Sequence, residues 1–293
     1  MILLKKHGLF YLIILLLILL PLNFTLRAAE TPFNYDPEKI EPGTMYCYKL
    51  FTSPDAARPA RKLFYYIGSS GEKSSTIEVL NLEYYDQGVA PYLNTYRMNW
   101  EKMMLESATW QYIGSKSNLP RGDVLHMETK FDFVRGRANW NSKSLAEDGL
   151  DRKNVSTKFQ TPTFFYFSNH VDGWTAMRFY PYPKKEIEVD VSNSFHVKDV
   201  RISYRGKETI SVPEGEIRCH KFEIAGKGML AWLFGKKAWL WMSAEDHKSY
   251  MVRYKNKNEW GHMAMMDLRL TSVEQISPGD WKRKVEKWST GDQ

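Results

Sequence analysis

The side chains of this sequence that could perform acid–base chemistry lie in three short pairs of histidine and acidic residues. The pairs are His126 with Glu128, His170 with Asp172, and Asp246 with His247. A zinc deaminase would add a Pro-Cys-x-x-Cys segment to the first pair, and a zinc protease would show His-Glu-x-x-His, but the sequence contains neither pattern. Strand spacing puts His126 and Glu128 together on a solvated face, and the other two pairs lie beside turn signals. We therefore expect no catalytic residues and no metal site.

Nucleophilic and phosphate-binding patterns are also missing from the sequence. It contains no Gly-x-Ser-x-Gly elbow and no glycine-rich phosphate loop. Cys47 and Cys219 alternate with apolar neighbours in predicted strands, and two cysteines so far apart are a poor basis for a zinc site. We expect two buried free thiols; a single long-range disulfide is the alternative in an oxidising compartment. The sequence thus predicts no cofactor and a protein that is not an enzyme.

The densest apolar segment, Met229 to Met242, is the main candidate for contact with a ligand or a membrane. Its candidate residues are Trp232, Phe234, Lys236, Lys237, Trp239 and Trp241. A central core hairpin packed on both faces explains this composition. A rim hairpin that meets lipid or a hydrophobic ligand explains it equally, because tryptophan and lysine both suit an apolar–aqueous boundary. Arg135 and Arg137, which follow a predicted strand, are candidates for an anion site, with a solvated strand end as the alternative.

The elements that must position these side chains are strands, because the dominant period from Gly43 onward is two. From Leu125 to Phe133, apolar residues alternate with His126, Glu128, Lys130 and Asp132, which is typical of a half-buried strand. The same alternation occurs within residues 96–101, 186–191 and 200–205, and later strands are expected at residues 238–242, 249–254 and 261–270. Pro213 to Gly215 predicts a hairpin turn. Short helices are expected near Ser144 to Arg152 and from Asp280 to Trp288.

Strands with one polar face and one apolar face indicate an antiparallel sheet. With few helices to cover it, a large sheet buries its apolar face by curling. The sequence therefore predicts a mainly β protein: a single curved antiparallel sheet that forms a half-barrel or open barrel, with few short helices.

The first 28 residues have the pattern of an export signal. Lys5 and Lys6 precede an apolar run from Leu9 to Leu20, and small residues follow at Ala28 and Ala29. The run is shorter than the roughly 20 residues of a membrane-spanning helix. We expect residues 1–28 to be a signal peptide or an N-terminal anchor and residues 29–293 to be a single β-rich periplasmic domain. An uncleaved signal would retain that domain at the membrane.

The charge of the chain argues against nucleic acid as a partner. The formal net charge is +7, and loss of residues 1–28 removes three basic residues and no acid, which leaves +4. Nucleic-acid binding requires a concentrated basic stripe. The one dense basic group comprises Lys282, Arg283, Lys284 and Lys287. Because Trp281, Val285 and Trp288 share another face of the predicted helix, this helix suits packing on the body of the protein or on anionic lipid.

Four segments between Thr163 and Thr271 resemble a known family. They are TFFYF at Thr163 to Phe167, ETISVPEGEIRCHKFEI at Glu208 to Ile224, WLWMSAEDHKSYMVRY at Trp239 to Tyr254, and the strand from Gly261 to Leu270. This stretch, about a third of the chain, is similar to bacterial exported proteins of unknown function related in fold to the LolA-type periplasmic lipoprotein carriers. The resemblance implies a curved antiparallel half-barrel and transfers no catalytic residues. The sequence departs from the family pattern at Ala244, Glu245 and Met251.

Two classes of function fit these observations. The first is an exported, non-enzymatic envelope protein that holds a lipid or other hydrophobic ligand in the concave apolar face of its sheet. The second is an envelope scaffold or interaction protein with a filled core and no ligand, which docks a partner protein of the envelope through an edge strand or the tryptophan hairpin. Contact with a membrane surface is compatible with both. A cavity of several hundred Å³ on the apolar face would separate them.

Overall fold

The structure is a computed structural model that describes most of the chain. The described residues are 33–53, 56–71, 74–85, 88–100, 104–115, 124–132, 137–146, 149–158, 164–166, 176–182, 184–193, 196–213, 215–226, 237–245, 250–256 and 266–289. Residues 31–293 form one compact unit. The predicted signal, residues 1–28, lies outside the described residues. Among the helices that the structure describes, none combines the length and hydrophobicity needed to cross a bilayer.

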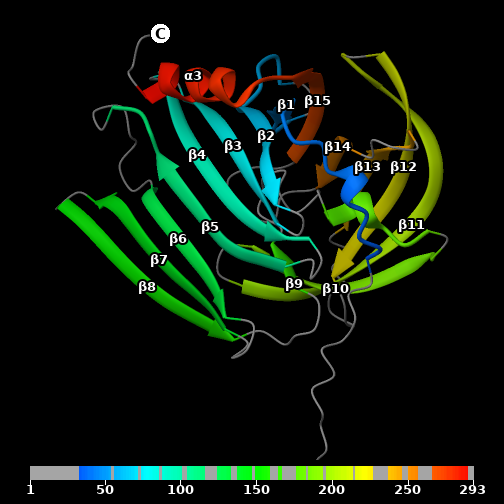
Figure 1. Ribbon diagram of the computed structural model, residues 1–293, viewed down its shortest axis with the longest axis horizontal. Coiled ribbons are helices and arrows are strands. Elements are labelled where there is room, and N and C mark those ends of the chain that lie inside the picture. Colours follow the sequence, from blue (N-terminus) through cyan, green and yellow to red (C-terminus); the bar gives the residue numbers. More distant parts are fainter. Residues whose placement is uncertain are drawn as a thin grey trace, which may run out of the picture. The chain divides into compact units, whose positions relative to one another are not determined.

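Fifteen strands of the described chain form one sheet (Figure 1). In chain order they are β1 (Thr44–Phe51), β2 (Arg61–Gly71), β3 (Ser74–Tyr85), β4 (Gly88–Asn99), β5 (Met104–Tyr112), β6 (Val124–Asp132), β7 (Arg137–Ala146), β8 (Gly149–Lys158), β9 (Phe164–Tyr166), β10 (Glu186–Asn193), β11 (His196–Val212), β12 (Gly215–Gly226), β13 (Lys237–Ser243), β14 (Met251–Asn256) and β15 (Met266–Gln275). A 3-10 turn, η1 (Pro37–Lys39), precedes the sheet, and helix α3 (Pro278–Ser289) follows it.

The sheet is open and almost entirely antiparallel. Its spatial order is β8-β7-β6-β5-β4-β3-β2-β1-β15-β14-β13-β12-β11-β10-β9, so β8 and β9 are the edges. Of the paired strands, β9 and β10 alone run parallel in the part of the chain that the structure describes. The predicted mainly β fold with one curved, unclosed sheet is confirmed.

The individual elements follow the sequence prediction with one clear exception. The hairpin turn at Pro213 to Gly215 joins β11 to β12, and Gly215 has a φ of +117°, a conformation that glycine adopts without strain. The predicted helix near Ser144 to Arg152 is wrong, because residues 144–146 belong to β7 and residues 149–152 to β8, and these strands pair from Ala146 with Gly149 outward. A helix of so few residues is marginal in isolation, and pairing with the neighbouring strand outweighs its local preference.

Alternate residues of the central strands face opposite sides of the sheet. On β1 and β2, Tyr46, Tyr48, Leu63 and Tyr65 point to one side and join the largest group of buried apolar residues. We call this side the tyrosine face. The residues between them, among which are Cys47, Lys49, Lys62 and Phe64, point to the other side, which we call the cation face.

The tyrosine face is filled by a short segment of the chain itself. Residues 176–179 form a 3-10 turn, and Phe179 is fully buried with its ring centroid 5.8 Å from that of Trp100. Tyr180 packs on Phe222 at 4.8 Å between centroids. The Arg178 guanidinium donates to the Lys39 carbonyl at 2.9 Å. The described part of this face is therefore packed by side chains where the sequence analysis placed a hydrophobic ligand.

Helix α3 packs on the cation face over the first strands (Figure 1). Trp281 is 4% exposed, and its ring stacks on Tyr66 of β2 with 4.9 Å between centroids. Val285 and Trp288 pack against the same cluster. The predicted C-terminal amphipathic helix is thus confirmed, with its apolar side on the body of the protein.

Both thiols predicted to be free are free in the structure. Cys47 lies on β1 and Cys219 on β12, and both are buried without a disulfide.

Candidate functional site

The site residues predicted from the sequence fall into two groups. Trp232, Phe234, Lys236 and Arg135 lie outside the described residues, as do the side chain of Arg137 at the start of β7 and the acid–base pairs at His170 and Asp246. Lys237, Trp239 and Trp241 are described and lie on β13. His126 and Glu128, on β6, belong to neighbouring positions on one face of the strand, as their spacing requires.

Trp241 lies in the core of the cation face. It is 6% exposed and packs with Ile210, Val212, Cys219 and Val252. Its indole Nε1 donates to Glu208 Oε1 at 2.6 Å. Trp239 is half-buried beside this cluster.

Basic side chains surround these two indole rings. The Lys221 ammonium lies 4.9 Å from the Trp239 ring centroid and 5.5 Å from that of Trp241, and it also pairs with Glu208 at 2.8 Å. Burial alone would raise the pKa of Glu208, but hydrogen bonds from Lys221 and Trp241 hold that pKa below its usual value. Cations against tryptophan faces are attracted by the ring quadrupole. Contact of Trp239 and Trp241 with a ligand or a membrane stays a prediction.

A row of four basic side chains crosses the cation face. The strand register places Lys62 directly opposite Lys49, Lys49 opposite Arg269, and Arg269 opposite Arg253, across β2, β1, β15 and β14. We call these four residues the cation row. Like charges directly opposite on neighbouring strands destabilise a sheet. The row therefore costs folding free energy unless negative charge compensates it.

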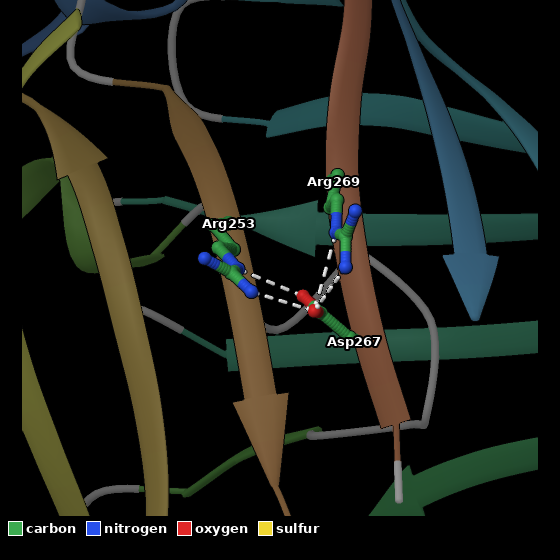
Figure 2. A network of polar contacts seen from close by, with 3 residues as sticks. All are labelled: Arg253, Asp267 and Arg269. Carbon is green, nitrogen blue, oxygen red and sulfur yellow. Dashed lines mark hydrogen bonds and ion pairs between the residues drawn. The ribbon is translucent and has the colours of Figure 1, made fainter. Parts of the chain in front are cut away.

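One buried carboxylate compensates part of the row (Figure 2). Asp267 is 1% exposed; it accepts from Arg253 Nε at 2.8 Å and Nη2 at 2.6 Å, and from Arg269 Nη2 at 2.8 Å. Burial opposes ionisation of Asp267, but the hydrogen bonds from both arginines outweigh it and lower its pKa. In the described part of the chain, ion pairs reach Arg253 and Arg269 but neither Lys49 nor Lys62.

A hollow of about 340 Å³ opens beside three residues of the row, Lys49, Arg253 and Arg269. Its lining residues are Lys49, Phe51, Ser211, Val212, Pro213, Arg253, Arg269 and Thr271. The predicted Pro213 turn forms one wall, because the end of β11 reaches β15 although three strands separate them in the sheet. The lining therefore combines three cations, the Ser211 hydroxyl and three apolar side chains, whereas the Thr271 hydroxyl already donates to the Cys47 carbonyl.

This lining determines what the hollow can do chemically. Cationic and hydroxyl donors converge on a small volume, which suits a phosphate, sulfate or carboxylate group. The lining holds no imidazole, carboxylate or thiol that could act as a general base or nucleophile. Among the residues that the structure describes, no three His, Cys, Asp or Glu side chains are grouped to hold a metal ion.

Sequence reasoning missed Lys49, Arg253 and Arg269 as site residues. Arg269 and Asp267 do alternate with Leu268 and Leu270 in the sequence, so their position on the polar face was predictable. Lys49, which lies opposite Arg269 in the neighbouring strand, was not predictable as part of the same site. It is more than two hundred residues away in the sequence, and only the strand register brings the two residues together.

Comparison with known proteins places the chain in a family. The model of a family described as "Protein of unknown function (DUF3108)" matches residues 112–269, more than half of the chain. The chain belongs to this family. The DUF3108 match begins in β5 and ends in β15, so it includes Arg253 and Arg269 but not Lys49. No curated protein matches the chain.

Two solved structures are similar to this DUF3108 protein. One is a candidate exported protein with a YmcC-like fold from Bacteroides fragilis, at 10% identity and a TM-score of 0.32, over 83% of this chain and 98% of that one. The other is a candidate lipoprotein from Parabacteroides distasonis, at 10% identity and a TM-score of 0.30, over 84% of this chain and 99% of that one. Scores this low say nothing about what the present chain binds.

Proposed function

We propose that this protein is an exported, non-enzymatic envelope protein that binds an anionic amphiphile, with the anionic group in the hollow of the cation face. Export is supported by the basic and apolar start of the sequence. The observation that supports an anionic amphiphile as the ligand is the lining of the hollow, where Lys49, Arg253 and Arg269 lie beside Phe51 and Val212. A lipid carrier related to the LolA type would suit this proposal.

The charges favour a doubly negative head group. Asp267 neutralises one unit of positive charge near the hollow, and three cations line it, so the net local charge is about +2. A phosphate monoester carries up to two negative charges at neutral pH. The volume lies at the lower end of the range for small-molecule pockets, so it accommodates a head group and the first methylenes rather than a whole lipid.

The scaffold alternative is favoured by a specific observation on the other face. Phe179 and Tyr180 fill the tyrosine face where a hydrophobic ligand was expected. If the hollow also stays empty in solution, the protein would be an interaction protein with a packed core.

Calorimetric titration with soluble, monomeric probes tests the proposal. Octyl phosphate supplies the charge and the chain, octyl glucoside the chain alone, and inorganic phosphate the charge alone. We expect octyl phosphate to bind most tightly and octyl glucoside not to bind measurably.

The decisive variant is Lys49→Gln, because it removes a charge that has only like-charged neighbours across the sheet. It should weaken octyl phosphate binding about tenfold, the loss expected for one charge-assisted contact, while the folded state becomes no less stable. Lys207→Gln, an exposed lysine on β11, is the matched control and should bind as the parent does. Equal affinity of both variants, or equal affinity for the two octyl probes, would refute the proposal.

A further inference from the structure

Helix α3 carries a basic outer side, at which Lys282 and Arg283 are exposed, while Lys284 reaches back to the sheet. Its cations are Lys282, Arg283, Lys284 and Lys287, and its acids are Asp280 and Glu286, which leaves a net charge of +2 on twelve residues. The side chains of Lys282 and Arg283 are 77% and 72% exposed. Their ion pairs with Glu286 and Asp280 lie within the helix and are solvated, so they contribute little to stability.

The helix is held rigidly enough to present these charges in one direction. Trp281 is buried against Tyr66, and its Nε1 donates to the Glu78 carboxylate on β3. Ser277 caps the helix by accepting from the Asp280 amide at 3.1 Å. The basic side is therefore fixed to the same face of the sheet as the cation row.

A phenylalanine connects the helix to the cation row. The Lys284 ammonium lies 4.4 Å from the Phe64 ring centroid, and the Lys62 ammonium lies 4.7 Å from the same centroid. Two ammonium groups on one ring repel each other, although each is attracted to the ring. Positive charge consequently continues from α3 through Lys284 and Lys62 to Lys49, Arg269 and Arg253.

We propose that α3 and the cation row form one surface that docks on an anionic lipid bilayer. Charge complementarity is the main argument, since a negative surface would compensate cations that the fold leaves close together. Trp288, half-buried at the end of α3, adds an amphipathic ring of the kind that membrane interfaces favour. Export, which the start of the sequence predicts, would place this surface in a compartment bounded by membranes.

This surface shares Lys49, Arg253 and Arg269 with the hollow of the proposed function but extends beyond it to Lys62 and α3. The hollow takes one anionic group between β1, β14, β15 and the Pro213 turn. The docking surface needs many negative charges at once and includes the outer side of α3, none of whose residues line the hollow.

Vesicle sedimentation with the full chain tests the docking surface. One set of vesicles contains phosphatidylcholine and phosphatidylglycerol at about three to one, and the other contains phosphatidylcholine only. Each basic side chain near an anionic membrane is worth about fivefold in affinity. The double variant Lys282→Gln and Lys287→Gln should therefore bind the anionic vesicles about 25-fold more weakly. The N-terminal apolar run is the same in every variant, so its contribution cancels.

The matched control is Lys184→Gln with Lys185→Gln, two exposed lysines that precede β10. Binding should stay at the parental level in this control. An equal loss in both double variants, or parental binding that does not depend on phosphatidylglycerol, would overturn the proposal. So would a DNA duplex or an acidic polypeptide that competes fully with the vesicles at equal negative charge.

Octyl phosphate titration keeps the two proposals apart. The α3 double variant should bind octyl phosphate as the parent does while it loses vesicle binding. If the protein binds anionic vesicles through α3 but does not bind octyl phosphate, the docking surface is supported and the head-group site is refuted. If it binds octyl phosphate but not the vesicles, the head-group site is supported and the docking surface is refuted.

Discussion

Replacement of the buried carboxylate Asp267 by asparagine gives the sharpest test of the charges on the cation face. Asp267→Asn keeps the size of the side chain but removes its charge and replaces one of the two oxygens that accept from Arg253 and Arg269 by an NH2 donor (Figure 2). Together with Lys49 they would then form a cluster of three adjacent cations, of which Arg253 still interacts with the Glu208 carboxylate.

The size of the effect follows from the exposure of the three partners. Breaking a buried ion pair by removal of one partner typically costs about 3–5 kcal/mol. The Asp267 side chain is only 1% exposed, but the Arg253 and Arg269 side chains are 25% and 35% exposed, so water screens part of the interaction that the substitution removes. We therefore expect a loss of about 2–3 kcal/mol in the free energy of unfolding. For a domain of this size that is roughly 5–10 °C in melting temperature.

Urea unfolding as a function of pH measures both the size and the sign. The pKa of Asp267 is lower in the folded state than its ordinary value of 3.8, so its contribution is complete above about pH 4. It is lost as the pH falls through the lowered folded pKa. The stability difference between parent and variant should accordingly be largest at neutral pH and shrink below pH 4.

Glu106→Gln serves as the control, because Glu106 pairs with Arg97 where both side chains are exposed. It should cost less than about 1 kcal/mol at any pH. The variant Asp267→Asn should also bind octyl phosphate more tightly than the parent, since the hollow gains one unit of positive charge. A variant as stable as the parent at pH 7, or a difference that grows in acid, would refute this account of the face.

Two further predictions concern Trp241 and Cys219, which pack together. Trp241→Ala should lower the free energy of unfolding in urea by about 3–5 kcal/mol, because the ring is buried. Trp241→Phe should lower it by about 1 kcal/mol, because the hydrogen bond to Glu208 is lost. Equal losses in the two variants would show that the ring contributes nothing beyond its hydrogen-bond donor. Burial, together with the Glu208 carboxylate, raises the pKa of the Cys219 thiol to about 12, so this thiol should react with a disulfide reagent at pH 8 only on unfolding. Cys47 should behave in the same way because the fold buries it out of reach of the reagent. Rapid reaction in the native state would contradict that.

The strands were predictable because their signal is local. Alternation of apolar and polar residues located β6 and β10 and indicated one curved antiparallel sheet, a continuous apolar run located β13, and the Pro213 to Gly215 segment predicted the turn. The exception at Ser144 to Arg152 has a physical cause, since a short segment without a strong period is decided by the strand beside it, here β7 paired with β8. Helix α3 was equally accessible, because Trp281, Val285 and Trp288 repeat at helical spacing.

The cation row was not predictable because it depends on register between strands far apart in the chain. Lys49 and Arg269 look like ordinary solvated residues in their own strands, and nothing near them in the sequence indicates a site. A shift of one residue between β1 and β15 would turn the two side chains to opposite faces. The filling of the tyrosine face has a similar origin, since residues 176–180 show no alternation and pack there only through contacts such as Phe179 with Trp100.

The two faces differ in what a ligand would have to displace. Entry on the tyrosine face requires Phe179 to leave its contacts with Trp100 and Tyr35, at a cost of about 2–3 kcal/mol for exposure of the ring alone. The Arg178 hydrogen bond to the Lys39 carbonyl and the bond from the Asn34 amide to the Phe179 carbonyl would be lost as well. On the cation face the hollow is already open, and an anion there relieves repulsion among Lys49 and its neighbours instead of breaking contacts. A ligand of ordinary affinity is therefore expected on the cation face first.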